Sequence, residues 1–164
     1  MVVLGIDAAS SSGWAVIRAP AGPLELVSWG KCNGKDFQSI VEVCQGAVAL
    51  GVDLAAIETP YVDQSPDVAI KLGLVVGRWA QEIDRHKIPW TGHKAAQWQH
   101  RLLAGLIGPS SPRDQRKLAA QRWVRANFAA RVGAAPISDD EADAICLAAW
   151  RAKESRFAAL VRRA

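Results

Sequence analysis

A short apolar run that ends in a single carboxylate constrains this chain more than any other feature. The run covers residues 2–7 and ends at Asp7; a turn of small residues (8–13) and a second β-type run (14–18) follow. This pattern predicts a β-hairpin within a sheet, with Asp7 on its first strand. A carboxylate there is costly to bury without a partner, and a metal ion or a phosphate-bound cation would be such a partner.

The remaining periodicity predicts an α/β fold. Hairpin-length turns join the first three strands, which indicates antiparallel pairing, and later strands alternate with helices, which indicates parallel pairing. The expected strands are 2–7, 14–18, 24–30, 54–58 and 88–90. The expected helices are 36–50, 66–86, 94–103, 113–128 and 139–151. A mixed sheet flanked by helices follows, in one domain over residues 1–164 with a basic tail at 153–164.

Composition excludes several classes of protein. At 164 residues, half of them apolar, the chain is expected to be globular. It has no apolar run of roughly 18 residues, so no membrane-spanning helix is expected. Its N-terminus lacks the pattern of a secretory signal. These features favour a cytoplasmic protein.

The net charge of +4 conceals a strong asymmetry. Residues 1–84 contain five Lys/Arg and ten Asp/Glu, whereas residues 85–131 contain ten Lys/Arg and only Asp114 as an acid. Such a basic block suggests a polyanionic partner, with nucleic acid favoured over a merely solvated surface. His93 and His100 lie seven apart in this block, on an expected helix, and are interpreted as surface or DNA-contacting residues rather than metal ligands.

Carboxylates recur where apolar residues would be expected. Glu58 ends the fourth strand, and Asp139, Asp140 and Asp143 open the last helix, with Asp140 and Asp143 on one face. Taken singly, each is also explained as a turn acid or as a partner of the helix dipole. If the first and fourth strands are neighbours, the acids converge on an all-oxygen site suited to Mg²⁺ or Mn²⁺. Two such ions could clamp a scissile phosphate, and together with the basic block this predicts a nuclease.

At these residues the chain resembles the RuvC Holliday junction resolvases, a family of the RNase H-like nuclease superfamily. The motifs are Gly5-Ile6-Asp7 with Gly13, the stretch from Ile57-Glu58 through Tyr61 to Gly77, and Asp140-Glu141-Ala142-Asp143. The chain departs from the family at Ala8, where proline is usual, and at Ser138-Asp139, where a histidine often precedes the acid pair.

The resemblance implies an RNase H-like fold and a crossover junction endodeoxyribonuclease. Asp7, Glu58, Asp140 and Asp143 match the catalytic metal-binding acids, with Asp139 as an alternative to Asp140. The implied cofactor is Mg²⁺, replaceable by Mn²⁺, with two ions per site. Tyr61 matches an aromatic that stacks on a base near the junction centre.

The implied substrate is a Holliday junction or related branched DNA, cut by paired symmetric nicks in a homodimer formed through the helix at 66–86. Gly73 and Gly77 in that helix predict a close approach of another helix or a sheet. A nucleoid-associated location in a bacterial or phage-infected cell is expected. Two alternatives stay open: a non-catalytic DNA-binding scaffold, and a relative of ATPases and sugar kinases, which the short chain disfavours. The expected DNA contacts, besides Tyr61, are Lys94, Arg113, Arg116, Lys117 and Arg122.

Overall fold

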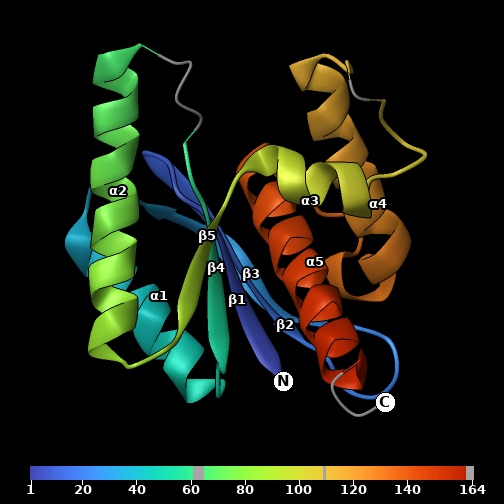
Figure 1. The fold of residues 1–164 in the computed structure, drawn as a ribbon, viewed down its shortest axis with the longest axis horizontal. Helices are drawn as coiled ribbons and strands as arrows, with labels where there is room; N and C mark the ends of the chain where they lie inside the picture. The colour runs from blue at the N-terminus through green and yellow to red at the C-terminus, as the bar shows by residue number, and fades with distance from the viewer. Residues whose placement is uncertain (61–64, 109, 162–164) are drawn as a thin grey trace.

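A five-stranded sheet lies at the centre of the protein, with helices on both of its faces (Figure 1). The computed structural model describes residues 1–60, 65–108 and 110–161. The strands are β1 (Val2–Asp7), β2 (Ser11–Arg18), β3 (Glu25–Asn33), β4 (Leu54–Glu58) and β5 (Trp90–His93). The helices are α1 (Phe37–Ala49), α2 (Pro66–Arg85), α3 (Ala95–Leu102), α4 (Arg113–Val132) and α5 (Asp139–Val161).

The strand order in the sheet is β3-β2-β1-β4-β5. β1 pairs antiparallel with β2, and β2 pairs antiparallel with β3, as their short connections require. β4 runs parallel to β1, and β5 runs parallel to β4, because a helix connects each of these strands to the one before it. The predicted mixed sheet is therefore confirmed, and the C-terminal ends of β1 and β4 lie side by side near its middle.

Each face of the sheet has its own apolar core. α1 and α2 cover one face, and α3, α4 and α5 cover the other (Figure 1). The core under α1 and α2 includes Leu4, Ile6, Val16, Ile40, Ile57 and Trp79. The core under the other three helices includes Val3, Ala15, Ala56, Trp98, Val124 and Leu147. Alternate side chains of β1 thus pack into opposite cores, as the two-residue period of a strand requires.

Helix α5 lies unusually close to the sheet because two glycines face it. A Cβ at Gly5 would meet the carbonyl oxygen of Ala144 and the side chain of Ala148, and a Cβ at Gly13 would meet the backbone of Asp140. Residues 144–150 are all buried, because α5 packs between the sheet and α4 and so has apolar neighbours almost all round. The glycines of the first hairpin therefore set the position of the acidic end of α5.

Several element boundaries differ from the predictions. β5 spans Trp90–His93 rather than 88–90: Ile88 is buried in the connection before the strand, and the strand itself is a partly exposed edge. α4 continues past a kink at Phe128 (φ −131°, ψ 27°) to Val132. β2 begins at Ser11, so the turn between β1 and β2 is shorter than predicted. β3 extends to Asn33, beyond its predicted end at residue 30.

The last helix is longer than predicted. α5 does not end near residue 151 but continues to Val161, so residues 153–161 of the expected basic tail are helical. The alanine-rich sequence favours this continuation. Neither α5 nor any other helix in the described residues combines the length and apolar composition that crossing a membrane takes.

The glycines of α2 do not contact another element of the same chain. A Cβ at Gly73 or Gly77 would have no neighbour within 4 Å in the described structure. The prediction of a close approach is therefore wrong within one protomer. The exposed side chains of Ile70 and Leu74 lie beside these glycines on the helix.

Candidate active site

Asp7 and Glu58 point toward the same face of the sheet. Val3 on β1 and Ala56 on β4 belong to the core under α5, and side chains two residues apart share a face. Asp7 and Glu58 are also direct register partners in the parallel pairing of β1 with β4. The structure therefore brings these two predicted site residues together beneath α5.

The first turn of α5 adds two further acids above these strand ends. A capping box fixes this turn: the Ser138 amide donates to Glu141 Oε2 at 2.9 Å, and the Glu141 amide donates to Ser138 Oγ at 3.3 Å. The backbone of Asp140 packs on Gly13, which is itself the register partner of Asp7. Asp143 follows one turn later on the same face of the helix. Asp7, Glu58, Asp140 and Asp143 thus converge at one end of the sheet.

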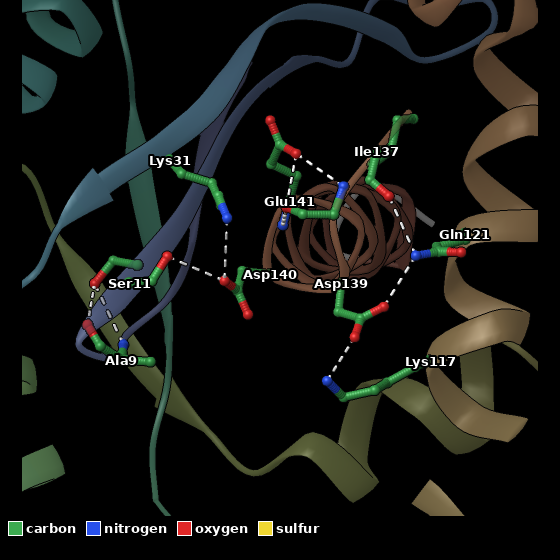
Figure 2. Close-up of polar contacts among 11 residues, drawn as sticks. Ala9, Ser11, Lys31, Lys117, Gln121, Ile137, Asp139, Asp140 and Glu141 are labelled. Carbon is green, nitrogen blue, oxygen red and sulfur yellow. Dashed lines mark hydrogen bonds and ion pairs between the residues drawn. The ribbon is translucent and has the colours of Figure 1, made fainter. Parts of the chain in front are cut away.

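The adjacent residues Asp139 and Asp140 point toward different neighbours of α5, Asp139 toward α4 and Asp140 toward the sheet (Figure 2). Asp139 accepts hydrogen bonds from Lys117 Nζ at 2.6 Å and from Gln121 Nε2 at 2.9 Å, both on α4. Asp140 Oδ2 accepts a hydrogen bond from Ser11 Oγ at 3.2 Å and lies 3.9 Å from Lys31 Nζ. Since α4 donors occupy both oxygens of Asp139, Asp140 is the better placed of the two to act with Asp7.

Burial raises the pKa values of three of these acids, and neighbouring charges add to the shift for Asp7 and Asp143. Burial raises the pKa of Asp7 well above its usual range, and the charges of Glu58, Asp143 and Asp140 raise it further. Burial, then the charge of Glu58, raises the pKa of Asp143 to about 8. Burial also raises the pKa of Glu58. Lys117 opposes the shifts of the Asp7 and Asp143 pKa values, so it lies within electrostatic reach of both acids.

These acids fit a hard divalent cation in their chemistry. Carboxylate oxygens are the ligands that Mg²⁺ and Mn²⁺ prefer, and a cation among them would offset both the burial of these charges and the repulsion between Asp7 and Asp143. In the conformation described, residues 1–60, 65–108 and 110–161 contain no group of three His, Cys, Asp or Glu side chains already close enough to hold an ion. The fit therefore rests on the donor set and its electrostatics.

Two residues with aromatic rings lie next to Glu58, although the sequence did not place them at the site. Trp98 is fully buried and donates its indole N–H to Glu58 Oε2 at 2.8 Å. His93 is the register partner of Glu58 in the pairing of β4 with β5, and its ring packs edge-on against Trp150 at 4.9 Å. The position of His93 corrects the expectation of a surface residue on a basic helix, because it ends a strand and is partly buried. Burial and the charge of Arg151 lower its pKa.

The place of Trp98 follows from the strand pairing rather than from a sequence motif. The parallel pairing of β4 with β5 places the end of β5 beside Glu58, and α3 begins two residues later. The fourth residue of that helix is Trp98. Trp98 therefore lies near the start of a helix that begins beside Glu58.

The predicted DNA-contacting residues lie in different places. The hydrogen bond to Asp139 raises the pKa of Lys117, and the nearby charge of Arg113 partly opposes this rise. Arg116 lies on the same turn of α4, whereas Arg122 comes nine residues after Arg113, about two and a half turns later, and so faces another side of the helix. Lys94 is exposed immediately before α3. Tyr61 lies outside the described residues.

The architecture matches solved structures over almost the whole chain. Thermus thermophilus RuvC matches with a TM-score of 0.73 and 20% identity, covering 96% of this chain and 97% of that one. RuvC of the same organism in complex with a Holliday junction substrate matches with a TM-score of 0.75 and 19% identity, covering 96% of each chain. This chain has the RuvC fold.

A viral enzyme shares the RuvC fold more distantly. The Fowlpox virus resolvase, solved with its substrate Holliday junction DNA, matches with a TM-score of 0.65 and 10% identity, covering 94% of this chain and 99% of that one. No protein-family model and no curated protein sequence matches the chain. The resemblance to RuvC-type resolvases is thus confirmed as a likeness of fold, and the motifs carry the argument about activity.

Proposed function

We propose that this protein is a divalent-metal-dependent endonuclease that resolves Holliday junctions or related branched DNA. One observation carries the proposal: Asp7 and Glu58 are paired at the ends of β1 and β4, beneath the acidic first turn of α5. The proposal is supported by the RuvC fold, since RuvC and the Fowlpox virus resolvase have both been solved with Holliday junction DNA. It corresponds to a crossover junction endodeoxyribonuclease.

Asp7, Glu58, Asp140 and Asp143 would hold the metal, with Mg²⁺ as the cofactor and Mn²⁺ as its substitute. Two ions bound there would activate the attacking water and stabilise the leaving oxygen during in-line hydrolysis of the phosphodiester. The carboxylates would fix the position of the ions, and their raised pKa values are those of groups that gain most from a bound cation. Asp139 would act through Lys117 rather than as a ligand.

The basic side chains would bind and orient the phosphate backbone. Lys117 is held at the edge of the acid group by its 2.6 Å bond to Asp139, where its ammonium group can attract a phosphate toward the acids. Arg113 and Arg116 would extend this attraction along α4, with Lys94 contributing from the start of α3. Arg122, on a different side of α4, would contact a more distant part of the DNA.

We also propose a homodimer through α2, because two symmetric nicks need two sites. Ile70 and Leu74 are 63% and 62% exposed, which is high for large apolar side chains. Gly73 and Gly77 lie on the same stripe with open space above them, so a second helix could approach closely. Tyr61, three residues after Glu58, would stack on a base near the junction centre.

The direct test is incubation of the purified chain with a labelled four-way junction and with a duplex of the same sequence. Mg²⁺-dependent nicks at symmetric positions on two opposing strands of the junction, without comparable cutting of the duplex, are expected. Tight junction binding without cutting in either Mg²⁺ or Mn²⁺ would instead support a DNA-binding scaffold. ATP hydrolysis without DNA binding would support the kinase-like alternative.

A further inference from the structure

We propose that Trp98 is a positioning residue of the metal site: its indole N–H holds the Glu58 carboxylate in the orientation that binds the cation. The inference rests on the proposed function and adds a residue that the acidic motifs do not contain. It starts from the bond between Trp98 Nε1 and Glu58 Oε2, which is 2.8 Å long.

The bond joins two elements that the fold holds rigidly. Glu58 is the last residue of β4, and its backbone is fixed by pairing with Asp7 on one side and His93 on the other. Trp98 is fully buried in the core shared by α3, α4 and α5. A buried indole in such a core has little rotational freedom. The direction of the N–H is therefore fixed relative to the end of β4.

The chemistry of the donor suits a residue that supports a metal ligand. An indole N–H can only donate, so it occupies one lone pair of Oε2 and leaves Oε1 for a cation. A carboxylate held in this way loses less side-chain entropy when it binds an ion. Partners that orient a ligand in this manner typically change metal affinity by about 10- to 100-fold.

A second tryptophan provides a matched control. Trp79 is also fully buried and also donates one indole hydrogen bond, but its acceptor is the hydroxyl of Ser12, at 3.2 Å, in the core under α1 and α2. Trp98→Phe and Trp79→Phe therefore remove the same atoms from equally buried positions. Only the first of them removes a donor from an acid of the proposed metal site.

The experiment measures Mn²⁺ affinity of the full chain without DNA, by electron paramagnetic resonance titration, alongside the free energy of unfolding in urea. Trp98→Phe is expected to weaken Mn²⁺ binding about tenfold. Trp79→Phe is expected to lower the free energy of unfolding as much as Trp98→Phe does, without changing Mn²⁺ affinity. A third variant carries benzothienylalanine at position 98, which keeps the ring size and replaces the N–H by sulfur. It is expected to bind Mn²⁺ as weakly as Trp98→Phe while remaining well folded.

Wild-type Mn²⁺ affinity in the benzothienylalanine variant would overturn the inference, because the ring and not its N–H would then matter. An equal loss of affinity in Trp79→Phe would overturn it too, since packing alone would explain the effect. In both cases the wild-type chain still binds Mn²⁺ and cuts junctions, so the proposed function stands. A wild-type chain that binds no Mn²⁺ and cuts nothing would contradict the proposed function itself.

Discussion

Asp7 and Glu58 are register partners at the last residues of two adjacent parallel strands, β1 and β4. Neighbouring strands lie about 4.8 Å apart, so the backbone alone holds these carboxylates close together. Asp140 and Asp143 of α5 add further negative charge. Burial raises the pKa of Asp7, Glu58 and Asp143, and the charges of neighbouring acids raise the pKa of Asp7 and Asp143 further. Without a bound metal ion, ionisation of these grouped acids should therefore lower the free energy of unfolding.

The first prediction concerns pH and stability without divalent ions. The pKa values of Asp7, Glu58 and Asp143 are higher in the folded state than in the unfolded state. At pH values between a group's unfolded pKa and its folded pKa, the folded state therefore binds more protons than the unfolded state. For Asp143 this window runs from 3.8 to about 8. The free energy of unfolding contributed by these acids is thus fully present below the window and is lost as the pH rises through it. Urea denaturation in EDTA across this range measures the loss.

The variant Asp143→Asn isolates the contribution of one acid to this pH dependence. The amide cannot ionise, so at pH 8 in EDTA the variant should be more stable than wild type, by on the order of 2 kcal/mol. Glu154→Gln is the control, because Glu154 forms an exposed ion pair with Arg101 and should change stability little at any pH. Equal pH profiles for Asp143→Asn and wild type would contradict the account of the grouped acids.

The second prediction concerns the glycine beneath α5. Gly13→Ala places a methyl group against the backbone of Asp140, which cannot move without displacing the helix. A loss of about 1–3 kcal/mol in the free energy of unfolding is expected, along with weaker Mn²⁺ binding. Gly73→Ala is the matched control: it lies in a helix with open space around it, and it should stabilise an isolated protomer by up to about 1 kcal/mol. Chemical denaturation at low protein concentration distinguishes the two effects.

The third prediction concerns the dimer. Leu74→Glu puts a charge on the exposed apolar stripe of α2 and should shift the chain toward monomer in sedimentation velocity experiments, without lowering protomer stability. Val48→Glu, at a 44% exposed position on α1, is the control and should leave the oligomeric state unchanged. A wild-type chain that sediments as a monomer at all concentrations tested would rule out the proposed α2 interface.

The fourth prediction concerns the basic side of α4. Arg113→Ala should weaken junction binding and reduce the slope of log affinity against log salt concentration by about 1, because one phosphate contact is lost. Arg156→Ala is a suitable control, since Arg156 donates to the carbonyl oxygens of Ala21 and Gly22 in the turn between β2 and β3, at the other end of the sheet. An unchanged salt slope in Arg113→Ala would contradict the proposed contact between Arg113 on α4 and the phosphate backbone.

The sequence predicted the parts of the site that depend on periodicity. Apolar runs that end in a carboxylate placed Asp7 and Glu58 at the ends of β1 and β4, and the i, i+3 spacing placed Asp140 and Asp143 on one helical face. It could not separate Asp139 from Asp140, because the difference depends on which donors come from α4 and from β2 and β3.

The contact between Trp98 and Glu58 was not predictable for a related reason. It requires the position of β5, and that strand was misplaced because its polar sequence, Thr91-Gly92-His93, lacks the apolar alternation of a buried strand. Once β5 is known to end at His93, the position of α3 beside Glu58 follows from the parallel register. Long-range pairing, rather than local propensity, was the missing information.

The central claim is that the paired strand acids form a nuclease site. Its most direct test compares Asp7→Asn, Glu58→Gln and the surface control Glu154→Gln on a four-way junction, with cleavage rate and junction affinity both measured. We expect the two site variants to bind the junction with wild-type affinity or better but to lose symmetric nicking in Mg²⁺, while the control cuts normally. Undiminished cleavage by either folded site variant would contradict the claim.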